Sequence, residues 1–149
     1  MGYFGALHTS ASALTAQRLR MDIISENIAN VNTTRTEAGT PYRRKTVIFE
    51  AKPGNVPFTS YLTEASRKLL GNNAGGVRVS AIVEDPSPFR SVYDPGHPDA
   101  DENGMVQMPN VDIVTEMVNL ISASRAYEAN VTSINTTKSM AMKALEIGR

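Results

Sequence analysis

Apolar residues recur at helical spacing through the first 35 residues of the chain. Leu7, Leu14, Met21 and Ile28 stand seven residues apart, and several neighbouring positions are also apolar. Residues three, four and seven apart lie along one side of an α-helix, so this pattern predicts an amphipathic helix. We expect the helix to run from about residue 3 to residue 31, a length of ~43 Å.

A second helical pattern occupies the end of the chain. Asn110 follows a proline and offers a side-chain oxygen as the N-cap, with Asp112 and Glu116 placed where the helix dipole favours negative charge. This pattern predicts a helix of ~55 Å. Its main stripe advances by three or four residues and consists of Ile113, Met117, Leu120, Ser124, Tyr127, Val131, Ile134, Lys138, Ala141 and Leu145.

The first half of this second helix carries more apolar surface than one partner covers. A further stripe lies beside the main one and consists of Val111, Val114, Val118 and Ile121. One neighbouring helix covers one stripe, so two stripes require at least two partners. The sequence therefore predicts contacts beyond the chain's own pair of helices.

The middle of the chain has the opposite character. All eight prolines lie between Pro41 and Pro109, and seven of the ten glycines lie between Gly39 and Gly104. Because these residues break regular structure, we expect short strands and turns here. Residues 71–76 are expected to form a loop, and residues 58–70 are ambiguous, with a short helix as one interpretation. Alternating and β-branched runs predict strands at 46–51, 77–83, 91–93 and 105–108, the last two paired with each other.

The predicted fold is mainly α with a small β-rich insert. The long N-terminal and C-terminal helices form an antiparallel, coiled-coil-like hairpin that is discontinuous in sequence. Residues 1–35 and 109–149 supply the two helices of this helical core domain, and residues 36–108 form the insert.

Composition removes several classes of function. The 149 residues include 15 basic and 15 acidic side chains, so no strong positive field is available for nucleic acid or an anionic membrane. The absence of cysteine excludes disulfides, thiolate zinc sites and cysteine nucleophiles. No apolar run approaches the ~18 residues that span a bilayer. The N-terminal stretch also lacks the basic and apolar regions of a cleaved signal peptide.

Catalytic and metal-binding motifs are weak. The chain has two histidines, His8 and His97, and no serine or carboxylate stands at triad-like spacing from His8. Residues 99–104 match the start of a calcium loop, but Asn110 stands where the bidentate glutamate is required. We interpret this stretch as a polar hairpin loop whose Asn103-Gly104 accepts positive φ. A calcium-binding or hydrolytic domain built on the same loop is a rival interpretation.

Polar side chains near the helices suggest roles in packing. Residues 42–45 form the basic cluster Tyr-Arg-Arg-Lys, whose field is too weak for nucleic acid in a neutral chain. We expect its charges to line a strand edge or to meet acidic groups on a neighbouring molecule. Asn27 and Asn30 accompany the first helical stripe, and buried amides of this kind can fix register and partner choice.

Both ends of the chain resemble the terminal motifs of the flagellar rod and hook family. The signature at the N-terminal end is Asn27-Ile-Ala-Asn30 within residues 21–33, and residues 110–130 resemble the C-terminal partner motif. Residues 39–45, 84–88 and 93–101 narrow the resemblance to the proximal rod proteins of that family. The similarity covers nearly the whole chain.

This resemblance implies a structural subunit that is not an enzyme and needs no cofactor or metal. The subunit would leave the cytoplasm through the flagellar export apparatus without a cleaved signal, and would join the basal-body rod in the periplasm. Its partners would be copies of itself, other rod proteins and rotor-base components on the MS-ring side, with no nucleic acid and no direct membrane insertion. The terminal helices would form the inner core of the tube. A freestanding helical adaptor or secretion chaperone with the same stripes is the alternative.

We predict that subunits pack against one another through the helical stripes and the amides beside them. The residues of this predicted interface are Leu7, Leu14, Met21, Asn27, Ile28, Asn30, Ile113, Met117, Leu120, Tyr127, Val131 and Ile134.

Overall fold

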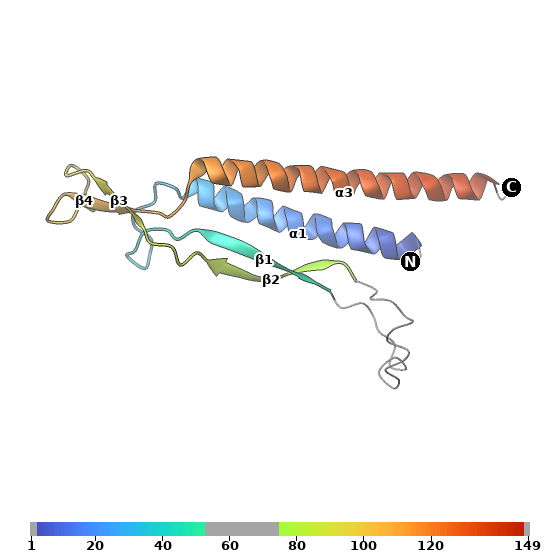
Figure 1. The fold of residues 1–149 in the computed structure, drawn as a ribbon, viewed down its shortest axis with the longest axis horizontal. Coiled ribbons are helices and arrows are strands. Elements are labelled where there is room, and N and C mark those ends of the chain that lie inside the picture. Colours follow the sequence, from blue (N-terminus) through green and yellow to red (C-terminus); the bar gives the residue numbers. More distant parts are fainter. Residues whose placement is uncertain (1–2, 53–74, 148–149) are drawn as a thin grey trace, which may run out of the picture. The chain divides into compact units, whose positions relative to one another are not determined.

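The chain folds into two long helices that flank a β-rich insert in the sequence. The computed structural model describes residues 3–52 and 75–147. Helices α1 and α3 are in contact and run in opposite directions (Figure 1), so the predicted fold class is confirmed. The described elements are α1 (Tyr3–Ala29), β1 (Lys45–Ala51), β2 (Val77–Glu84), β3 (Arg90–Tyr93), β4 (Met105–Met108) and α3 (Ile113–Ile147).

Helix α1 ends two residues earlier than the sequence pattern predicts. The carbonyl oxygen of Glu26 accepts two hydrogen bonds from Asn30, one from its side-chain amide at 2.9 Å and one from its backbone amide at 3.1 Å. The Thr33 amide and hydroxyl then both donate to Asn30, to its carbonyl at 3.0 Å and its Oδ1 at 3.1 Å. Asn30 thus turns the chain out of the helix, because its side chain competes for the bonds that would extend the helix.

Helix α3 begins after Asp112, and the prediction that Asn110 caps it is wrong. The Asp112 carboxylate accepts hydrogen bonds from the amide and hydroxyl of Thr115, and the Asp112 carbonyl accepts the Glu116 amide at 3.0 Å. These are the bonds of an N-cap residue. The hydrogen bonds to Thr115 lower the pKa of Asp112, the hydroxyl having the larger effect.

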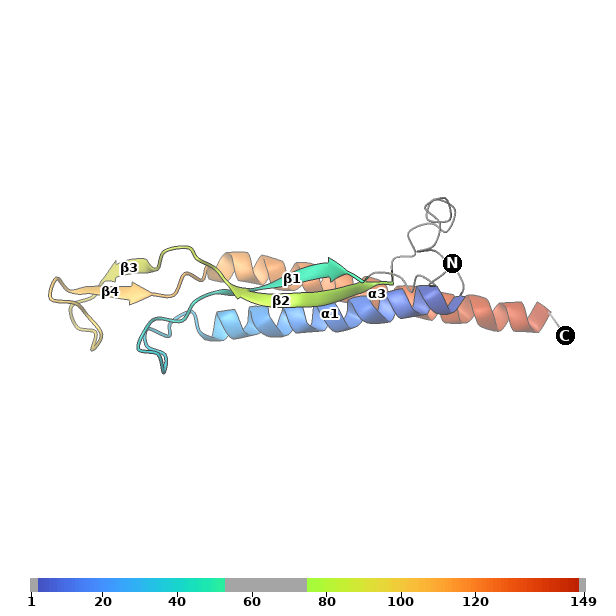
Figure 2. The ribbon, with the colours of Figure 1, turned by 90° about the horizontal axis from the view of Figure 1, so that it is seen from below.

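Strands β1 and β2 form a two-stranded antiparallel ribbon (Figure 2). Bonds just beyond its two ends fix this direction. The Lys52 amide donates to the Gly76 carbonyl at 2.8 Å, and the Asp85 amide donates to the Arg44 carbonyl at 2.8 Å. Both strands lie where the sequence predicts them, and each is one residue longer than predicted.

Strands β3 and β4 pair with each other, so the predicted pairing of residues 91–93 with 105–108 is confirmed. Arg90 pairs with Met108 and Tyr93 pairs with Met105. The connecting loop closes through the Asp94 amide, which donates to the Gly104 carbonyl at 2.9 Å. Gly104 adopts a φ of 72°, a conformation that favours glycine. Residues 58–70, for which a short helix is one interpretation, lie outside the described residues. The part of the expected loop from residue 71 to residue 74 lies outside them as well.

Contacts divide the chain into two compact units. One comprises Leu19–Ile48 and Ala81–Ser124. It contains the buried side chains Ile23, Ile24, Asn27, Tyr42, Val106, Pro109, Val111, Glu116 and Ala123. The other comprises Met1–Arg18, Phe49–Ser80 and Arg125–Arg149. Within it Ala16 is buried, and the Val77 amide at the start of β2 donates to the Ser12 hydroxyl of α1 at 3.0 Å.

Candidate functional site

The end of α1 is joined to β1 through the side chain of Asn27, which is fully buried. Asn27 Oδ1 accepts the Lys45 amide at 2.9 Å and the Tyr42 hydroxyl at 3.0 Å. Asn27 Nδ2 donates to the Lys45 carbonyl at 2.9 Å and to Glu116 Oε2 at 3.0 Å. All four hydrogen-bonding positions of the amide are therefore used, and the side chain pairs with β1 much as another strand would.

A buried carboxylate joins α3 to the same place. The Glu116 side chain is 1% exposed, and its Oε1 accepts Nε and Nη2 of Arg44 at 2.9 and 2.7 Å. Burial lowers the pKa of Arg44, but the hydrogen bonds and charge of Glu116 outweigh it and raise that pKa above its ordinary value. A buried carboxylate without such a partner would be strongly destabilising, so Arg44 and Glu116 depend on each other. We call Asn27, Tyr42, Arg44, Lys45 and Glu116 the buried polar network.

Asn110 ties the chain before α3 to the network. Its Oδ1 accepts the Arg44 amide at 2.8 Å, and its Nδ2 donates to the carbonyl oxygens of Asp85 and Ser87, both at 3.2 Å. Arg44 Nη1 also approaches Asp85 Oδ2 at 3.3 Å. This use of the amide explains why Asn110 does not cap the helix.

Tyr42 and Lys45 complete the network at its edge. Burial, followed by the nearby charge of Glu26, raises the pKa of Tyr42 to about 12. The Lys45 ammonium pairs with Glu26 Oε1 at 2.6 Å and lies 5.5 Å from the centre of the Tyr42 ring. Of the two alternatives expected for residues 42–45, a strand edge fits Lys45, which begins β1. The acidic partners that the structure gives Arg44 and Lys45 belong to the same chain.

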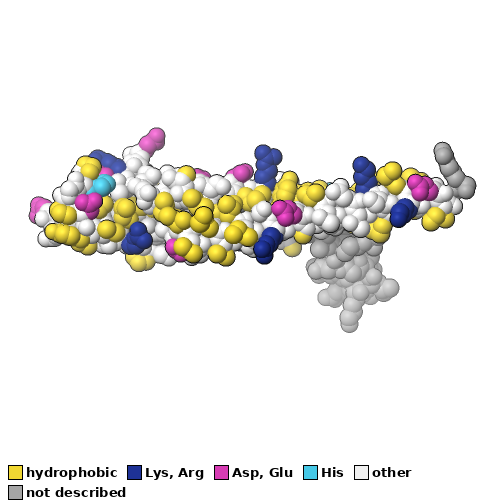
Figure 3. Space-filling model, turned by 90° about the horizontal axis from the view of Figure 1, so that it is seen from above, with side chains coloured by type: hydrophobic (Ala, Val, Ile, Leu, Met, Phe, Trp, Pro, Cys, Tyr) yellow, Lys and Arg dark blue, Asp and Glu magenta, His cyan; other side chains and the backbone are white. Residues whose placement is uncertain are grey.

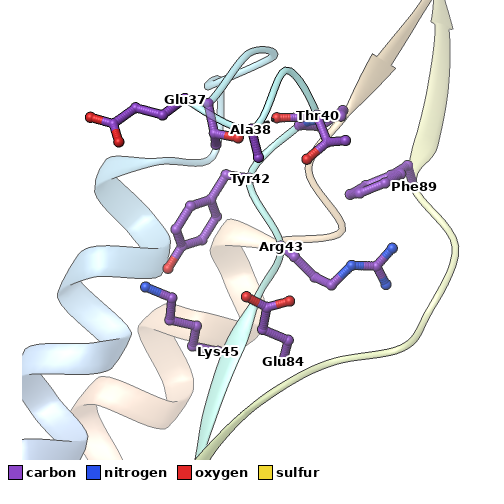
Figure 4. A pocket seen from close by; sticks show the side chains of 10 residues that line it. Glu37, Ala38, Thr40, Tyr42, Arg43, Lys45, Glu84 and Phe89 are labelled. Carbon is purple, nitrogen blue, oxygen red and sulfur yellow. Dashed lines mark hydrogen bonds between the residues drawn. The ribbon is translucent and has the colours of Figure 1, made fainter.

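An open cavity of about 650 Å³ lies beside this network and is lined by aromatic and charged side chains (Figure 4). The Arg43 guanidinium stacks 4.5 Å from the centre of the Phe89 ring and donates to the carbonyls of Asp85 and Ser87 at 2.9 and 3.2 Å. Because Arg43 and Lys45 already have partners, we interpret the cavity as a junction of the fold.

The exposed face of α3 is strongly apolar. In its first three turns Ile113, Val114, Met117, Val118 and Ile121 are between 43% and 69% exposed. Figure 3 shows hydrophobic side chains gathered over this part of the molecule. The sequence pattern predicts that Val111 belongs to the second apolar stripe. In the structure Val111 precedes α3 and is only 5% exposed, so it is not part of this face. We call the five exposed residues the α3 apolar face.

The other predicted interface residues lie mostly on the sides of the helices that are partly covered within the chain. The half-buried members of the predicted interface are Leu7, Leu14, Met21, Ile28, Asn30, Leu120, Tyr127, Val131 and Ile134. Asn27 is buried in the network, while Ile113 and Met117 are exposed. The prediction that these residues form contacts between subunits stays a prediction.

Glu116, Arg44 and Tyr42 are central here, and the sequence pattern assigned them no such role. The helical pattern predicts for Glu116 only a favourable interaction with the helix dipole. A signal was available, because Glu116 precedes Leu120, Ala123 and Tyr127 by four, seven and eleven residues on one stripe. A carboxylate within an otherwise apolar or small stripe predicts a buried cation as its partner.

The candidate calcium loop is held by side chains of its own chain. Asp99 Oδ2 accepts the Thr34 hydroxyl at 2.9 Å, and its Oδ1 lies 3.7 Å from Arg35. Across residues 3–52 and 75–147, no group of three or more histidine or acidic side chains is placed to hold a metal ion. In the same two ranges, no helix combines the length and hydropathy that crossing a bilayer demands.

Two family models match the ends of the chain. Residues 7–35 match the model described as Flagella basal body rod protein. Residues 102–147 match the model described as Flagellar basal body rod FlgEFG protein C-terminal. These segments contain α1 from Leu7 onward, β4 and α3.

Curated relatives match over the whole chain. The flagellar basal-body rod protein FlgC of Bacillus subtilis is 52% identical over 153 residues, covering 100% of both chains. The protein of the same name from Borreliella burgdorferi is 49% identical, covering 99% of this chain and 98% of its own. The one from Salmonella typhimurium is 40% identical, covering 100% of both. The chain therefore belongs to the family of flagellar basal-body rod proteins FlgC.

Proposed function

We propose that this chain polymerises through α1 and α3 into the shaft that transmits torque across the periplasm. Its family is one of structural rod components and not of enzymes. In this proposal the helical core of residues 1–35 and 109–149 makes the contacts between subunits, and the insert of residues 36–108 lies outside that core. Torque then passes through side-chain packing, whose stiffness depends on tightly filled interfaces.

The observation that carries this proposal is the α3 apolar face. Five large apolar side chains at consecutive helical spacings stand open to solvent in the single chain. A contiguous exposed apolar surface of this kind marks a site where proteins associate. Covering it with helices of neighbouring subunits would remove that surface from water, at roughly 25 cal/mol per Å² of apolar area.

Membership of the family supports a proposal for the partners and location of the chain. We propose contacts with copies of this chain, with other rod proteins and with rotor-base components on the MS-ring side. We further propose that the chain reaches the periplasm through the flagellar export apparatus without a cleaved signal.

Gene deletion tests this function. We expect cells that lack the gene to be non-motile and bald by electron microscopy, and the intact gene to restore filaments. Mass spectrometry of purified basal bodies should detect the chain in the restored cells, with an N-terminus that shows no signal cleavage. Normally flagellated cells, or a chain found only in the soluble fraction, would favour the helical adaptor or chaperone instead.

A further inference from the structure

Helices α1 and α3 carry matching seven-residue repeats, and these leave their mutual register poorly determined. On α1 the half-buried side chains Leu7, Leu14, Met21 and Ile28 repeat every seven residues. On α3 the half-buried side chains Leu120, Tyr127, Ile134 and Ala141 do the same. A slide of one helix by seven residues, ~10 Å along the axis, would bring another apolar position to each contact.

The buried polar network does not repeat in this way. Asn27 and Glu116 are each fully buried, and their side chains meet at 3.0 Å. A slide that moved α3 by seven residues would set Ala123 near Asn27 and leave Glu116 without its amide partner. Buried polar groups are costly when unpaired, so a contact of this kind penalises every other register.

The network also includes the insert. Asn27 exchanges two hydrogen bonds with the backbone of Lys45, and Glu116 accepts two from Arg44. Residues 42–45 are therefore held by α1 and by α3 at one level. A change of register between the helices would break the attachment of β1 to one of them.

We propose that the buried polar network fixes the register of α1, α3 and the start of β1, and so sets the height at which the α3 apolar face is presented. Asn27, Arg44 and Glu116 are positioning residues in this proposal, acting through the geometry of the helices. This register is a property of the single chain and does not depend on its function in the rod.

The chain contains no cysteine, so a pair of spin labels can report the register directly. Ala29 on α1 and Ser122 on α3 are exposed and lie outside the network. Because Asn27 lies level with Glu116, these positions are about eight residues apart along the axis, ~12 Å. A seven-residue slide in either direction changes that offset by ~10 Å and hence changes the distance between labels.

The decisive variant replaces the ion pair with apolar side chains, Arg44→Met with Glu116→Met, in the chain labelled through Ala29→Cys and Ser122→Cys. Replacing a buried pair in this way generally preserves or raises stability. We expect the parent to give one narrow distance by pulsed electron paramagnetic resonance. The variant should keep its helicity by circular dichroism but show a shifted or second distance. Labelled chain diluted tenfold with unlabelled chain removes signals between molecules.

A matched control removes an ion pair elsewhere. Glu50 and Arg78 pair at 2.9 Å across β1 and β2, both half exposed, and Glu50→Met with Arg78→Met should leave the narrow distance unchanged. A folded Arg44→Met, Glu116→Met variant with the parent's distance would overturn the proposal. If that variant does not fold, Asn27→Leu decides in its place, since it removes the contribution of α1 and keeps the ion pair. An unchanged narrow distance in folded Asn27→Leu would likewise overturn the proposal.

Discussion

At the scale of single residues, Tyr42 links the stability of the fold to alkaline pH. Its pKa is raised to about 12, first by burial and then by Glu26, whereas an exposed tyrosine has a pKa of about 10. Because the folded-state pKa lies above the unfolded one, the neutral hydroxyl contributes stability that is fully present below pH ~10. That contribution is lost as the pH rises through ~12.

We expect the melting temperature of the chain to fall more steeply between pH 10 and 12 than that of Tyr42→Phe. Comparing the two cancels the titration of lysines, which occurs in the same range. At pH 8 the variant should be less stable by about 1 kcal/mol, because it lacks the hydroxyl that donates to Asn27 Oδ1. Parallel pH profiles for the two proteins would show that Tyr42 does not ionise with a raised pKa.

Gly76 lies where the chain approaches α1 too closely for a side chain. It has a φ of 99°, and a Cβ there would overlap the Ser12 hydroxyl, which accepts the Val77 amide. Gly76→Ala should therefore lower the free energy of unfolding by ~2 kcal/mol or more. Gly39 has a φ of 76° with nothing within 4 Å of its Cβ position, so Gly39→Ala provides the control, at ~1 kcal/mol. Urea denaturation of both variants checks the difference, and equal losses would show that the contact with Ser12 is unimportant.

The sequence pattern indicates that Asn27 is suited to fixing register, but it does not indicate which groups Asn27 binds. Amides at helical stripes are visible in the sequence as exceptions to an apolar pattern. The partners of Asn27 are Lys45 and Glu116, which lie 18 and 89 residues away in the sequence. No local pattern encodes contacts at such separations. Arg44 stands in a run of three basic residues that look alike in the sequence. Only the fold shows that Arg44 pairs with Glu116 on α3 while Arg43 stacks on Phe89.

At the scale of elements, the start of α3 depends on Asp112. Asp112→Ala removes the acceptor of the Thr115 amide and hydroxyl, so we expect the melting temperature to fall by about 3 °C. Asp112→Asn should retain most of the cap, and Asp22→Ala, on an exposed part of α1, should change little.

The cap also makes stability depend on pH. Because the hydrogen bonds lower the pKa of Asp112, the contribution of Asp112 to stability is present above its unfolded-state pKa. This contribution is lost as the pH falls through the folded-state pKa. Thermal melts at neutral and acid pH would refute the assignment if Asp112→Ala matched the parent at neutral pH.

The helices and strands themselves could be predicted because their signals are local. Seven-residue apolar repeats and the absence of proline marked α1 and α3, and alternation with flanking glycine or proline marked the four strands. The sequence predicts the wrong cap for α3 because Asn110 and Asp112 are both good capping residues. The choice between them is made by Arg44, Asp85 and Ser87, which occupy Asn110 from other parts of the chain.

At the scale of the whole molecule, α3 has one side that is partly covered within the chain and one side that is open to solvent. The sequence pattern predicts both stripes but does not show which one the chain itself covers. Leu120 lies half-buried on the side that Glu116 and Ala123 share, while Val118 is 61% exposed on the α3 apolar face. A charge placed on each side should therefore have different consequences for the free chain.

Leu120→Asp and Val118→Asp separate folding from assembly. Leu120→Asp places a carboxylate on the half-buried side of α3 and should lower the free energy of unfolding by about 3 kcal/mol. Val118→Asp replaces an exposed side chain, so the purified chain should melt within about 1 °C of the parent. In cells we expect both variants to be synthesised normally and to block filament formation, the second because a charge would be buried unpaired between subunits. Val118→Ile is the conservative control and should restore swimming. Normal motility with Val118→Asp would mean that the α3 apolar face stays open to solvent in the rod, and the contacts between subunits would then have to be sought on the other predicted positions of the helices.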